Sequence, residues 1–201
     1  MKFRALFLLF FFSIASLQAK TIIVLGDSLS AGYGIDIQKS WVNLLKERLN
    51  NQYPDYRLIN LSTSGDTTSN GLQKLKMAIP KYGPEIIIIE LGANDGLRGL
   101  PVAAMKQNLA KMLDMSRRAG AKVLLLGTYL PPNYGPAYRK LFDNVYAQLA
   151  RQYHAALVPM FLEGVAGYNQ FMQQDGLHPN EQAQQRILDN IWPHLTSILH
   201  K

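Results

Sequence analysis

Residues 21–34 of the chain read TIIVLGDSLSAGYG. The segment begins with an unbroken β-branched and apolar run, residues 21–25, which is typical of a parallel strand buried on both faces. Gly26 ends the run, and Ser28 follows two residues later in a sharp turn. Because ligands of open α/β sheets bind outside the carboxyl ends of the strands, a serine at this point is well placed for chemistry.

The rest of the chain alternates between short apolar runs and amphipathic stretches. We expect further strands at residues 57–61, 85–91, 121–127 and 156–158. The run EIIIIEL at 85–91 contains four consecutive isoleucines and is the strongest candidate for a central strand. This alternation predicts a parallel sheet that is covered by helices on both faces.

Five helices are expected, at residues 40–51, 71–81, 101–118, 137–149 and 181–199. Ser40 has a side chain that caps helix N-termini well. A spacing of four residues indicates the inward face of the fourth helix: Ala137, Leu141, Val145 and Leu149. Pro193 should kink or interrupt the last helix, because proline removes a backbone hydrogen bond there.

The first nineteen residues differ from the rest. Lys2 and Arg4 precede an almost wholly apolar stretch, residues 5–15, and Ala19 offers a small residue for cleavage. This layout is typical of a secretory signal peptide, and the apolar stretch is shorter than the roughly 20 residues that span a membrane. We expect export, cleavage after about Ala19 and a single domain at residues 20–201, with an uncleaved membrane anchor as the alternative.

Composition excludes several classes of protein. The formal net charge of the 201 residues is +7, and removal of Lys2 and Arg4 with the signal peptide leaves 7 − 2 = +5. No nucleic-acid motif accompanies this charge, so we expect no nucleic-acid partner. The chain has no cysteine, which excludes disulfides, cysteine nucleophiles and thiolate metal sites.

Four polar segments hold residues suited to acyl transfer: residues 26–29, 63–67, 92–95 and 175–178. Ser28 would be the nucleophile, His178 the base that takes its proton, and Asp175 the carboxylate that orients the base. The oxyanion donors would be the backbone N–H groups of Ser28 and Gly65 and the side-chain amide of Asn94.

Each segment alone also has a simpler interpretation. The first could be any strand-to-helix turn, and Gly65 and Asn94 could serve only as turn residues. Together, however, the segments occur in the order that the chemistry needs, and the carboxyl ends of parallel strands share one edge of a sheet. The α/β-hydrolase elbow, G-x-S-x-G, is disfavoured because Ser30 stands where its second glycine should be.

The chain resembles the SGNH, or GDSL, hydrolase family. The resemblance is carried by GDSLSAGYG (26–34), NLSTSGDTTSNGL (60–72), LGANDGLRG (91–99) and DGLHPN (175–180). The four residues that name the family match Ser28, Gly65, Asn94 and His178, and the similarity covers nearly the whole mature chain. Within the family, the chain is most similar to exported bacterial enzymes that act on acyl-CoA thioesters, esters and lysophospholipids.

This resemblance implies a three-layer α/β/α flavodoxin-like fold with a five-stranded parallel sheet, and a periplasmic location. It also implies hydrolysis of thioesters, esters and lysophospholipids through an acyl-enzyme intermediate. We expect no metal or organic cofactor, small acyl substrates as partners, transient contact with membrane lipid, and a monomer. The resemblance further implies that residues 95–101 move when substrate binds; Leu97 and Leu100 would either line an acyl groove or merely cap the sheet.

Two other functions remain open at this point. A carbohydrate O-acetylesterase would use the same site on short acyl groups. A non-catalytic binding protein could be built on the same sheet, but binding alone has no need for a base such as His178.

Overall fold

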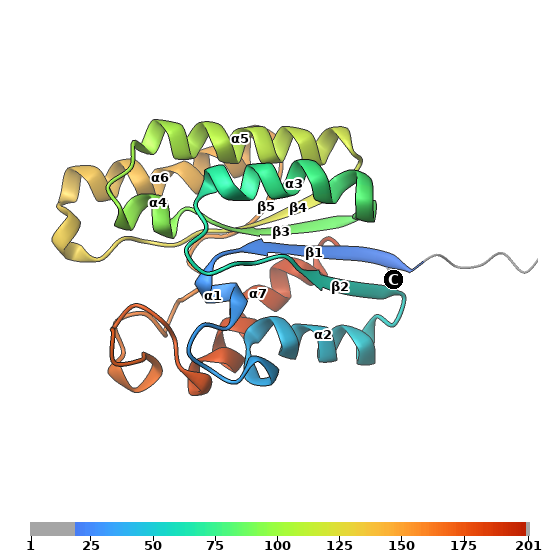
Figure 1. The fold of residues 1–201 in the computed structure, drawn as a ribbon, viewed down its shortest axis with the longest axis horizontal. Helices are drawn as coiled ribbons and strands as arrows, with labels where there is room; N and C mark the ends of the chain where they lie inside the picture. Colours follow the sequence, from blue (N-terminus) through green and yellow to red (C-terminus); the bar gives the residue numbers. More distant parts are fainter. Residues whose placement is uncertain (1–18, 200–201) are drawn as a thin grey trace, which may run out of the picture.

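A sheet of five parallel strands lies at the centre of the computed structural model, which describes residues 19–199 (Figure 1). Its strand order, β2-β1-β3-β4-β5, is that of flavodoxin-like folds. The strands are β1 (Lys20–Gly26), β2 (Tyr56–Asn60), β3 (Ile86–Glu90), β4 (Lys122–Leu126) and β5 (Ala156–Val158). The expected five-stranded parallel sheet is therefore confirmed. Residues 1–18 of the predicted signal peptide lie outside the described residues, so its cleavage stays a prediction.

Helices cover both faces of the sheet and make three layers (Figure 1). One face carries α2 (Trp41–Gln52) and α7 (Gln184–Thr196). The other carries α3 (Thr68–Tyr82), α5 (Val102–Arg118) and α6 (Pro136–Tyr153). Two short helices, α1 (Ser28–Ala31) and α4 (Ala93–Leu97), lie at the edge where the strands end. The three-layer α/β/α architecture is thus the one that the family resemblance implied.

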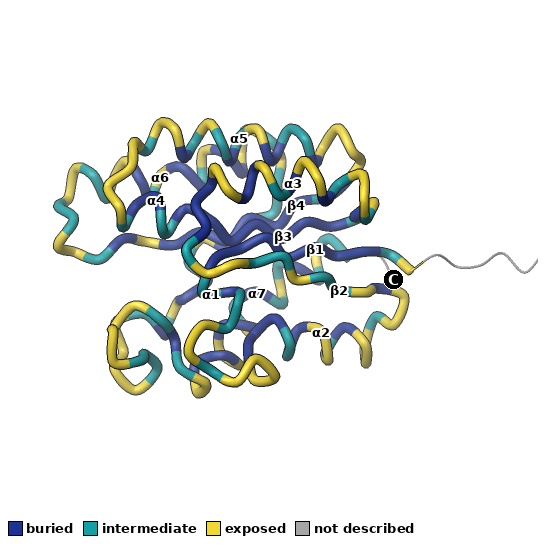
Figure 2. The backbone as a smooth tube through the Cα atoms, viewed as in Figure 1, coloured by how far each residue is buried: buried dark blue, intermediate teal, exposed yellow. Residues whose placement is uncertain are grey.

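The central strands divide the apolar core into two clusters. Ile22 and Val24 of β1 pack toward α2 and α7, whereas Ile23 and Leu25 pack toward α3, α5 and α6. Side chains of a strand point alternately to opposite faces, so a strand covered on both sides needs apolar residues throughout. All five residues of β3 are buried, as Figure 2 shows for the middle of the sheet.

The five expected helices are present, but several of their ends differ by about three or four residues from the expected ones. The Ser40 side chain caps α2 by accepting a hydrogen bond from the Asn43 N–H, as expected. The last helix, however, is not interrupted at Pro193, because α7 continues through that residue to Thr196.

The inward face of α6 also differs from the prediction. Ala137 is exposed and the Leu141 side chain is 64% exposed, whereas Val145 and Leu149 are buried. A helix advances 100° per residue, so positions spaced by four drift about 40° at each step and leave the buried face within a few turns. The face that packs on the sheet is instead Phe142, Val145, Tyr146 and Leu149.

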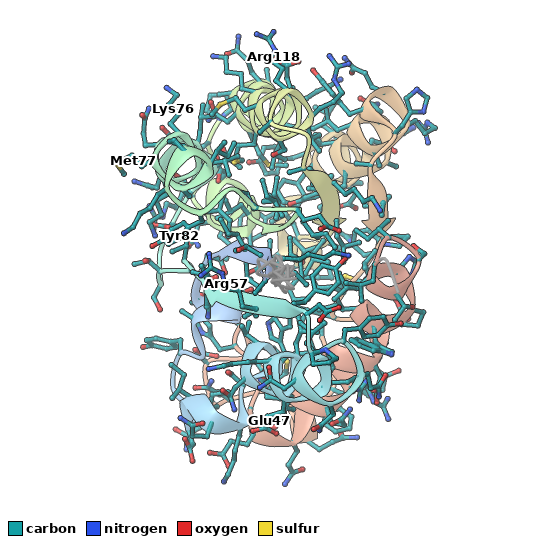
Figure 3. All side chains as sticks on the ribbon, turned by 90° about the vertical axis from the view of Figure 1, so that its right-hand side faces the viewer. Glu47, Arg57, Lys76, Met77, Tyr82 and Arg118 are labelled. Carbon is teal, nitrogen blue, oxygen red and sulfur yellow. The ribbon has the colours of Figure 1, made fainter. Side chains whose placement is uncertain are left out.

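The outer sides of the helices carry mainly polar side chains, with Met77 and Leu141 as exposed apolar exceptions. Figure 3 shows Lys76 and Met77 of α3 and Arg118 of α5 pointing away from the sheet. Across residues 19–199, no helix combines the length and the apolar character needed to cross a membrane.

Truncation of a core residue of β3 should destabilise the protein far more than truncation on the outer side of α6. Ile88→Ala should lower the free energy of unfolding by about 2–5 kcal/mol, because its fully buried side chain leaves a cavity. Leu141→Ala is the control and should change it by less than about 0.5 kcal/mol. Urea denaturation followed by circular dichroism measures both. Equal losses would mean that α6 packs with the face that the four-residue spacing indicated.

Candidate active site

The predicted site residues lie where the strands end. Ser28 is the first residue of α1 directly after β1, and Asn94 lies in α4 after β3. Gly65 is in the loop after β2. Asp175 and His178 belong to a long loop that precedes the 3-10 helix η4 (Glu181–Ala183). This loop, drawn in red in Figure 1, runs beside α1, so that segments from both ends of the chain meet at one edge of the sheet.

A continuous chain of hydrogen bonds links Ser28, His178 and Asp175. The Ser28 Oγ lies 2.9 Å from the Nε2 of His178, and the Nδ1 of His178 lies 2.6 Å from the Oδ2 of Asp175. An ionised carboxylate only accepts hydrogen bonds, so the Nδ1 carries the ring proton and the Nε2 is left to accept from the serine hydroxyl. The structure thus brings together the three residues that the sequence selected for acyl transfer.

The Asp175 carboxylate is held by its own turn. Its Oδ1 accepts hydrogen bonds from the backbone N–H groups of Leu177 (2.9 Å) and His178 (3.0 Å). Gly176 adopts a φ of +67°, which glycine tolerates without strain, and this lets the chain fold back over the carboxylate. Burial alone would raise the pKa of Asp175, but the bonds from the His178 backbone and ring and from Leu177 lower that pKa to about 2. Asp175 therefore stays charged beside the imidazole at any ordinary pH.

Two residues that the sequence analysis did not select support His178 from the side. The Tyr33 ring lies against the imidazole, with ring centroids 4.6 Å apart. The Nε2 of Gln173 donates to the carbonyl oxygens of Tyr33 (2.8 Å) and Pro179 (3.1 Å), and the Gln173 N–H donates to the His178 carbonyl (2.7 Å). Gln173 thus ties the loop that carries His178 to the loop that follows α1.

The predicted oxyanion donors are placed differently from one another. The Nδ2 of Asn94 donates to the Oδ2 of Asp27 and to the carbonyl oxygen of Asp66, both at 3.0 Å, so both of its hydrogens have acceptors. The backbone N–H groups of Ser28 and Gly65 have no hydrogen-bond partner among the described residues. The Gly65 carbonyl accepts from the Arg98 guanidinium at 2.9 Å, which fixes that peptide.

Two buried carboxyl groups lie behind the nucleophile, and sequence reasoning missed their role. Asp27 and Glu90 are each only 1% exposed. Asp27 caps α1 by accepting from the Leu29 N–H, and it holds Asn94. Burial raises the pKa of Asp27 to about 6 and that of Glu90 well above its usual range. A signal was available, because an acidic residue closes the otherwise apolar run of residues 86–90.

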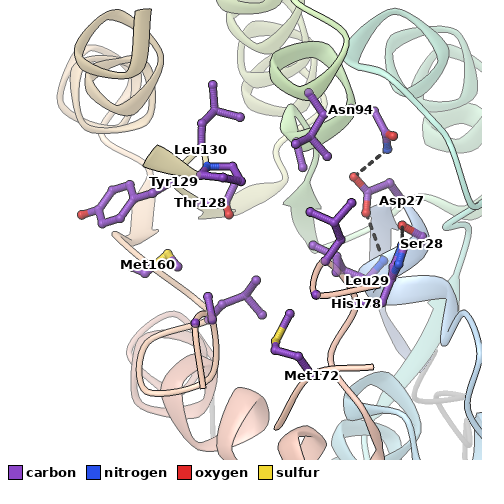
Figure 4. A pocket seen from close by; sticks show the side chains of 18 of the residues that line it. Asp27, Ser28, Leu29, Asn94, Thr128, Tyr129, Leu130, Met160, Met172 and His178 are labelled. Carbon is purple, nitrogen blue, oxygen red and sulfur yellow. Dashed lines mark hydrogen bonds between the residues drawn. The ribbon is translucent and has the colours of Figure 1, made fainter. Parts of the chain in front are cut away.

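An apolar pocket of about 530 Å³ opens from the Ser28 and His178 side chains. Figure 4 shows these two residues at one end and Tyr129, Leu130 and Met160 across the cavity. Leu97 lines the pocket, but Leu100 is not among its lining residues and is 39% exposed. Of the two leucines considered for an acyl groove, only Leu97 is therefore in position. Further apolar lining comes from Leu29, Leu162, Ala166, Met172 and Leu177.

Within residues 19–199, no group of three or more His, Cys, Asp and Glu side chains is arranged to hold a metal ion. The reactive groups of this edge are instead a hydroxyl, an imidazole and carboxylates.

A family model for the GDSL-like lipase/acylhydrolase family matches residues 24–186. The chain belongs to this family. The resemblance that rested on four short blocks of sequence is thereby confirmed, and Ser28 is the serine of the GDSL motif itself.

Relatives within the GDSL family extend over nearly the whole chain. Esterase TesA of Pseudomonas aeruginosa PAO1 is 51% identical over 181 residues, which cover 90% of each chain. The thioesterase 1/protease 1/lysophospholipase L1 of Escherichia coli K12 is 39% identical over 171 residues, 85% of this chain and 81% of that protein. A crystal structure of TesA is similar in fold, with a TM-score of 0.87 and 50% identity, and covers 90% of this chain and 100% of that chain.

Loss of the Gln173 bridge should slow turnover in this GDSL-family protein without weakening substrate binding. Gln173→Ala frees the loop of His178 from Tyr33, and small misplacements of a reacting group cost on the order of 10- to 100-fold in rate. We expect kcat to fall in that range while KM stays within about threefold. Gln170→Ala is the matched control, because the Gln170 side chain is exposed and makes no hydrogen bond among the described residues. Steady-state kinetics on a p-nitrophenyl ester measures both; a wild-type kcat for Gln173→Ala would show that the bridge does not position His178.

Proposed function

We propose that the chain is a serine acyl-hydrolase that cleaves fatty-acyl thioesters, carboxylic esters and lysophospholipids through Ser28, His178 and Asp175. The observation that supports this best is the hydrogen-bonded chain of 2.9 Å and 2.6 Å from the Ser28 Oγ to the Asp175 carboxylate, at the mouth of an apolar pocket. The names of the two relatives, an esterase and a thioesterase/protease/lysophospholipase, support the same substrate classes.

In the first half of the reaction, the Ser28 Oγ attacks the acyl carbonyl carbon and its proton passes to the Nε2 of His178. The Asp175 carboxylate stabilises the imidazolium that forms. The bond from the acyl carbon to the thiol sulfur or alcohol oxygen then breaks. His178 returns the proton to that leaving group, and the acyl chain remains esterified to Ser28.

The negative charge of each tetrahedral intermediate would be held by the N–H groups of Ser28 and Gly65 and by the Asn94 amide. In the second half, His178 takes a proton from water, whose oxygen attacks the acyl carbon. The bond to the Ser28 Oγ breaks, Ser28 takes the proton from His178, and the fatty acid leaves. All proton transfers are thus assigned to a single imidazole.

The pocket supports a substrate with a hydrocarbon chain. Its walls are mainly aliphatic side chains together with Tyr129. Asp27, Ser28, Asn94 and His178 supply polar groups at one end, and Thr128 lies across the cavity. A cavity of about 530 Å³ falls in the range of small-molecule sites and is far larger than an acetyl group needs. This favours long acyl chains over the short ones of an O-acetylesterase.

We also propose that the mature protein acts in the periplasm as a monomer and touches membrane lipid only transiently. The location rests on the signal-peptide pattern of residues 1–19. The lipid contact rests on Tyr129 and Leu177, which line the pocket and are 46% exposed each. Fractionation of cells that express the whole chain tests the location, analytical ultracentrifugation of the purified protein tests the monomer, and co-sedimentation with lipid vesicles tests the lipid contact.

Removal of the nucleophile or of the base should abolish hydrolysis. Ser28→Ala and His178→Ala should each lower kcat by about 10⁴–10⁶-fold on p-nitrophenyl esters, acyl-CoAs and lysophospholipids, since each removes an obligatory step. Ser197→Ala and His194→Ala, which change the same residue types in and after α7, are the controls and should leave kcat unchanged. Serine-independent turnover would contradict the mechanism. Activity confined to acetyl esters would favour the O-acetylesterase, and no activity at all would favour a binding protein.

The length of the acyl chain should control catalytic efficiency until the pocket is full. Each added methylene contributes about 0.8 kcal/mol when buried, so kcat/KM should rise by up to about fourfold per CH₂. Ala166→Phe fills part of the cavity and should shift the optimum to shorter chains, whereas Ala104→Phe, on the exposed side of α5, should not. A series of p-nitrophenyl esters measures the profile; an unchanged optimum in Ala166→Phe would place the acyl chain elsewhere.

A further inference from the structure

Asp27 and Glu90 form a buried pair of carboxyl groups directly behind the nucleophile. The Glu90 Oε2 accepts hydrogen bonds from the Ser30 hydroxyl (2.7 Å) and from the Asp27 N–H (3.2 Å). Gly26 lies opposite Glu90 in the sheet, and a Cβ at Gly26 would come within 2.8 Å of that same oxygen. The missing side chain of Gly26 is what lets the Glu90 carboxyl reach Ser30.

Within residues 19–199, the positive charge that acts on Asp27 is that of the His178 imidazole, which is present only when that ring is protonated. The charge that acts on Glu90 is the negative charge of Asp27. The Tyr146 hydroxyl of α6 is close enough to Glu90, Asp27 and Asp95 for their charges to raise its pKa. Neither a tyrosine nor an aspartate can supply a positive charge. No lysine or arginine of the described residues is among these neighbours. Two bare carboxylates in such a dry site would repel one another strongly, so the pair has to retain one proton.

The pattern of hydrogen bonds indicates that Glu90 is the acid that carries the proton. Each Asp27 oxygen accepts from an N–H group, Oδ1 from Leu29 and Oδ2 from Asn94, both at 3.0 Å, as suits a carboxylate. The Ser30 hydroxyl and the Asp27 N–H both donate to the Oε2 of Glu90, which leaves the Oε1 to carry a proton. The two carboxyl groups also lie close enough to hydrogen-bond to one another, and such a bond requires a proton between them. The pKa directions agree, because burial raises the pKa of Glu90 well above its usual range.

We propose that Glu90 is a positioning residue of the active site: as a neutral carboxylic acid it donates to Asp27 and keeps Asp27 an anion that fixes the Asn94 amide. This inference rests on the proposed hydrolase function. The Asp27 carboxylate holds one hydrogen of the Asn94 Nδ2, and the other points to the neutral carbonyl oxygen of Asp66. A charged oxyanion is a stronger acceptor than that carbonyl, so the second hydrogen turns to the oxyanion when the intermediate forms.

Infrared spectroscopy tests the protonation state without substrate. At pH 8, about two units above the pKa of Asp27, the wild type should show the C=O stretching band of a buried carboxylic acid. Glu90→Gln should remove the band, and Ser30→Ala should shift it to higher frequency, because the acid loses a hydrogen bond to its carbonyl oxygen. Glu85→Gln, on the same chain just before β3, is the control and should leave the band in place. Absence of the band in the wild type, or its survival in Glu90→Gln, would overturn the proposal.

Kinetics tests the positioning role. Glu90→Gln preserves a donor toward Asp27 and should keep kcat within about threefold of wild type. Glu90→Leu should lower kcat by on the order of 10²–10³-fold, as loss of one oxyanion donor does, with KM nearly unchanged. Wild-type kcat in folded Glu90→Leu, or a loss above tenfold in Glu90→Gln, would overturn the proposal. Either of these results would reject the role of Glu90 but not the need for Ser28 in hydrolysis. Turnover in Ser28→Ala would instead reject the proposed hydrolase function, without affecting the infrared evidence for a protonated Glu90. If Glu90→Leu does not fold, the infrared spectra of Ser30→Ala and Glu90→Gln and the kcat of Glu90→Gln test the proposal.

Discussion

Strands β1 and β3 pair in parallel along five residues, and this pairing sets the geometry of everything at the carboxyl edge of the sheet. The register places Gly26 opposite Glu90, so both chains leave the sheet at the same level. The turn after β1 then carries Ser28, and the turn after β3 carries Asn94. A shift of one residue would move every side chain of a strand to the other face, and the two apolar clusters would no longer form. The packing of the core therefore fixes the strand register, and the register fixes the relative positions of Ser28 and Asn94.

Much of this arrangement was predictable because it follows from local patterns. Buried parallel strands need continuous apolar runs, which is why the four isoleucines of β3 predicted its central place. The order of strands then brought the turn of Ser28 and that of Asn94 to one edge. Asp175 and His178 could be paired from sequence, because a bond across three residues depends mainly on the turn between them.

Other features depend on tertiary contacts that leave no local pattern. Leu141 is exposed because another side of α6 packs on the sheet. A spacing of four residues does not show which of two adjacent sides of a helix will be buried. The hydrogen bond from Gln173 to Tyr33 joins residues that are 140 positions apart, and the composition of the two loops does not predict it. The place of Glu90 at the end of a buried strand could be predicted from sequence. Its partner, Ser30, could be identified only once the strand register was known. Long-range pairs of this kind account for most of what the sequence did not reveal about the site.

The bonds of the Ser28, His178 and Asp175 chain differ greatly in the length of polypeptide that they close. His178 and Asp175 are three residues apart, whereas His178 and Ser28 are 150 residues apart. During folding, the short loop between acid and base costs little chain entropy, but the contact with the serine waits until the first and last parts of the chain have met. The acid and base can therefore assemble as a unit before the rest of the molecule is in place. Catalytic competence, by contrast, becomes a late and global event, which makes enzymatic activity a sensitive kinetic reporter of complete folding.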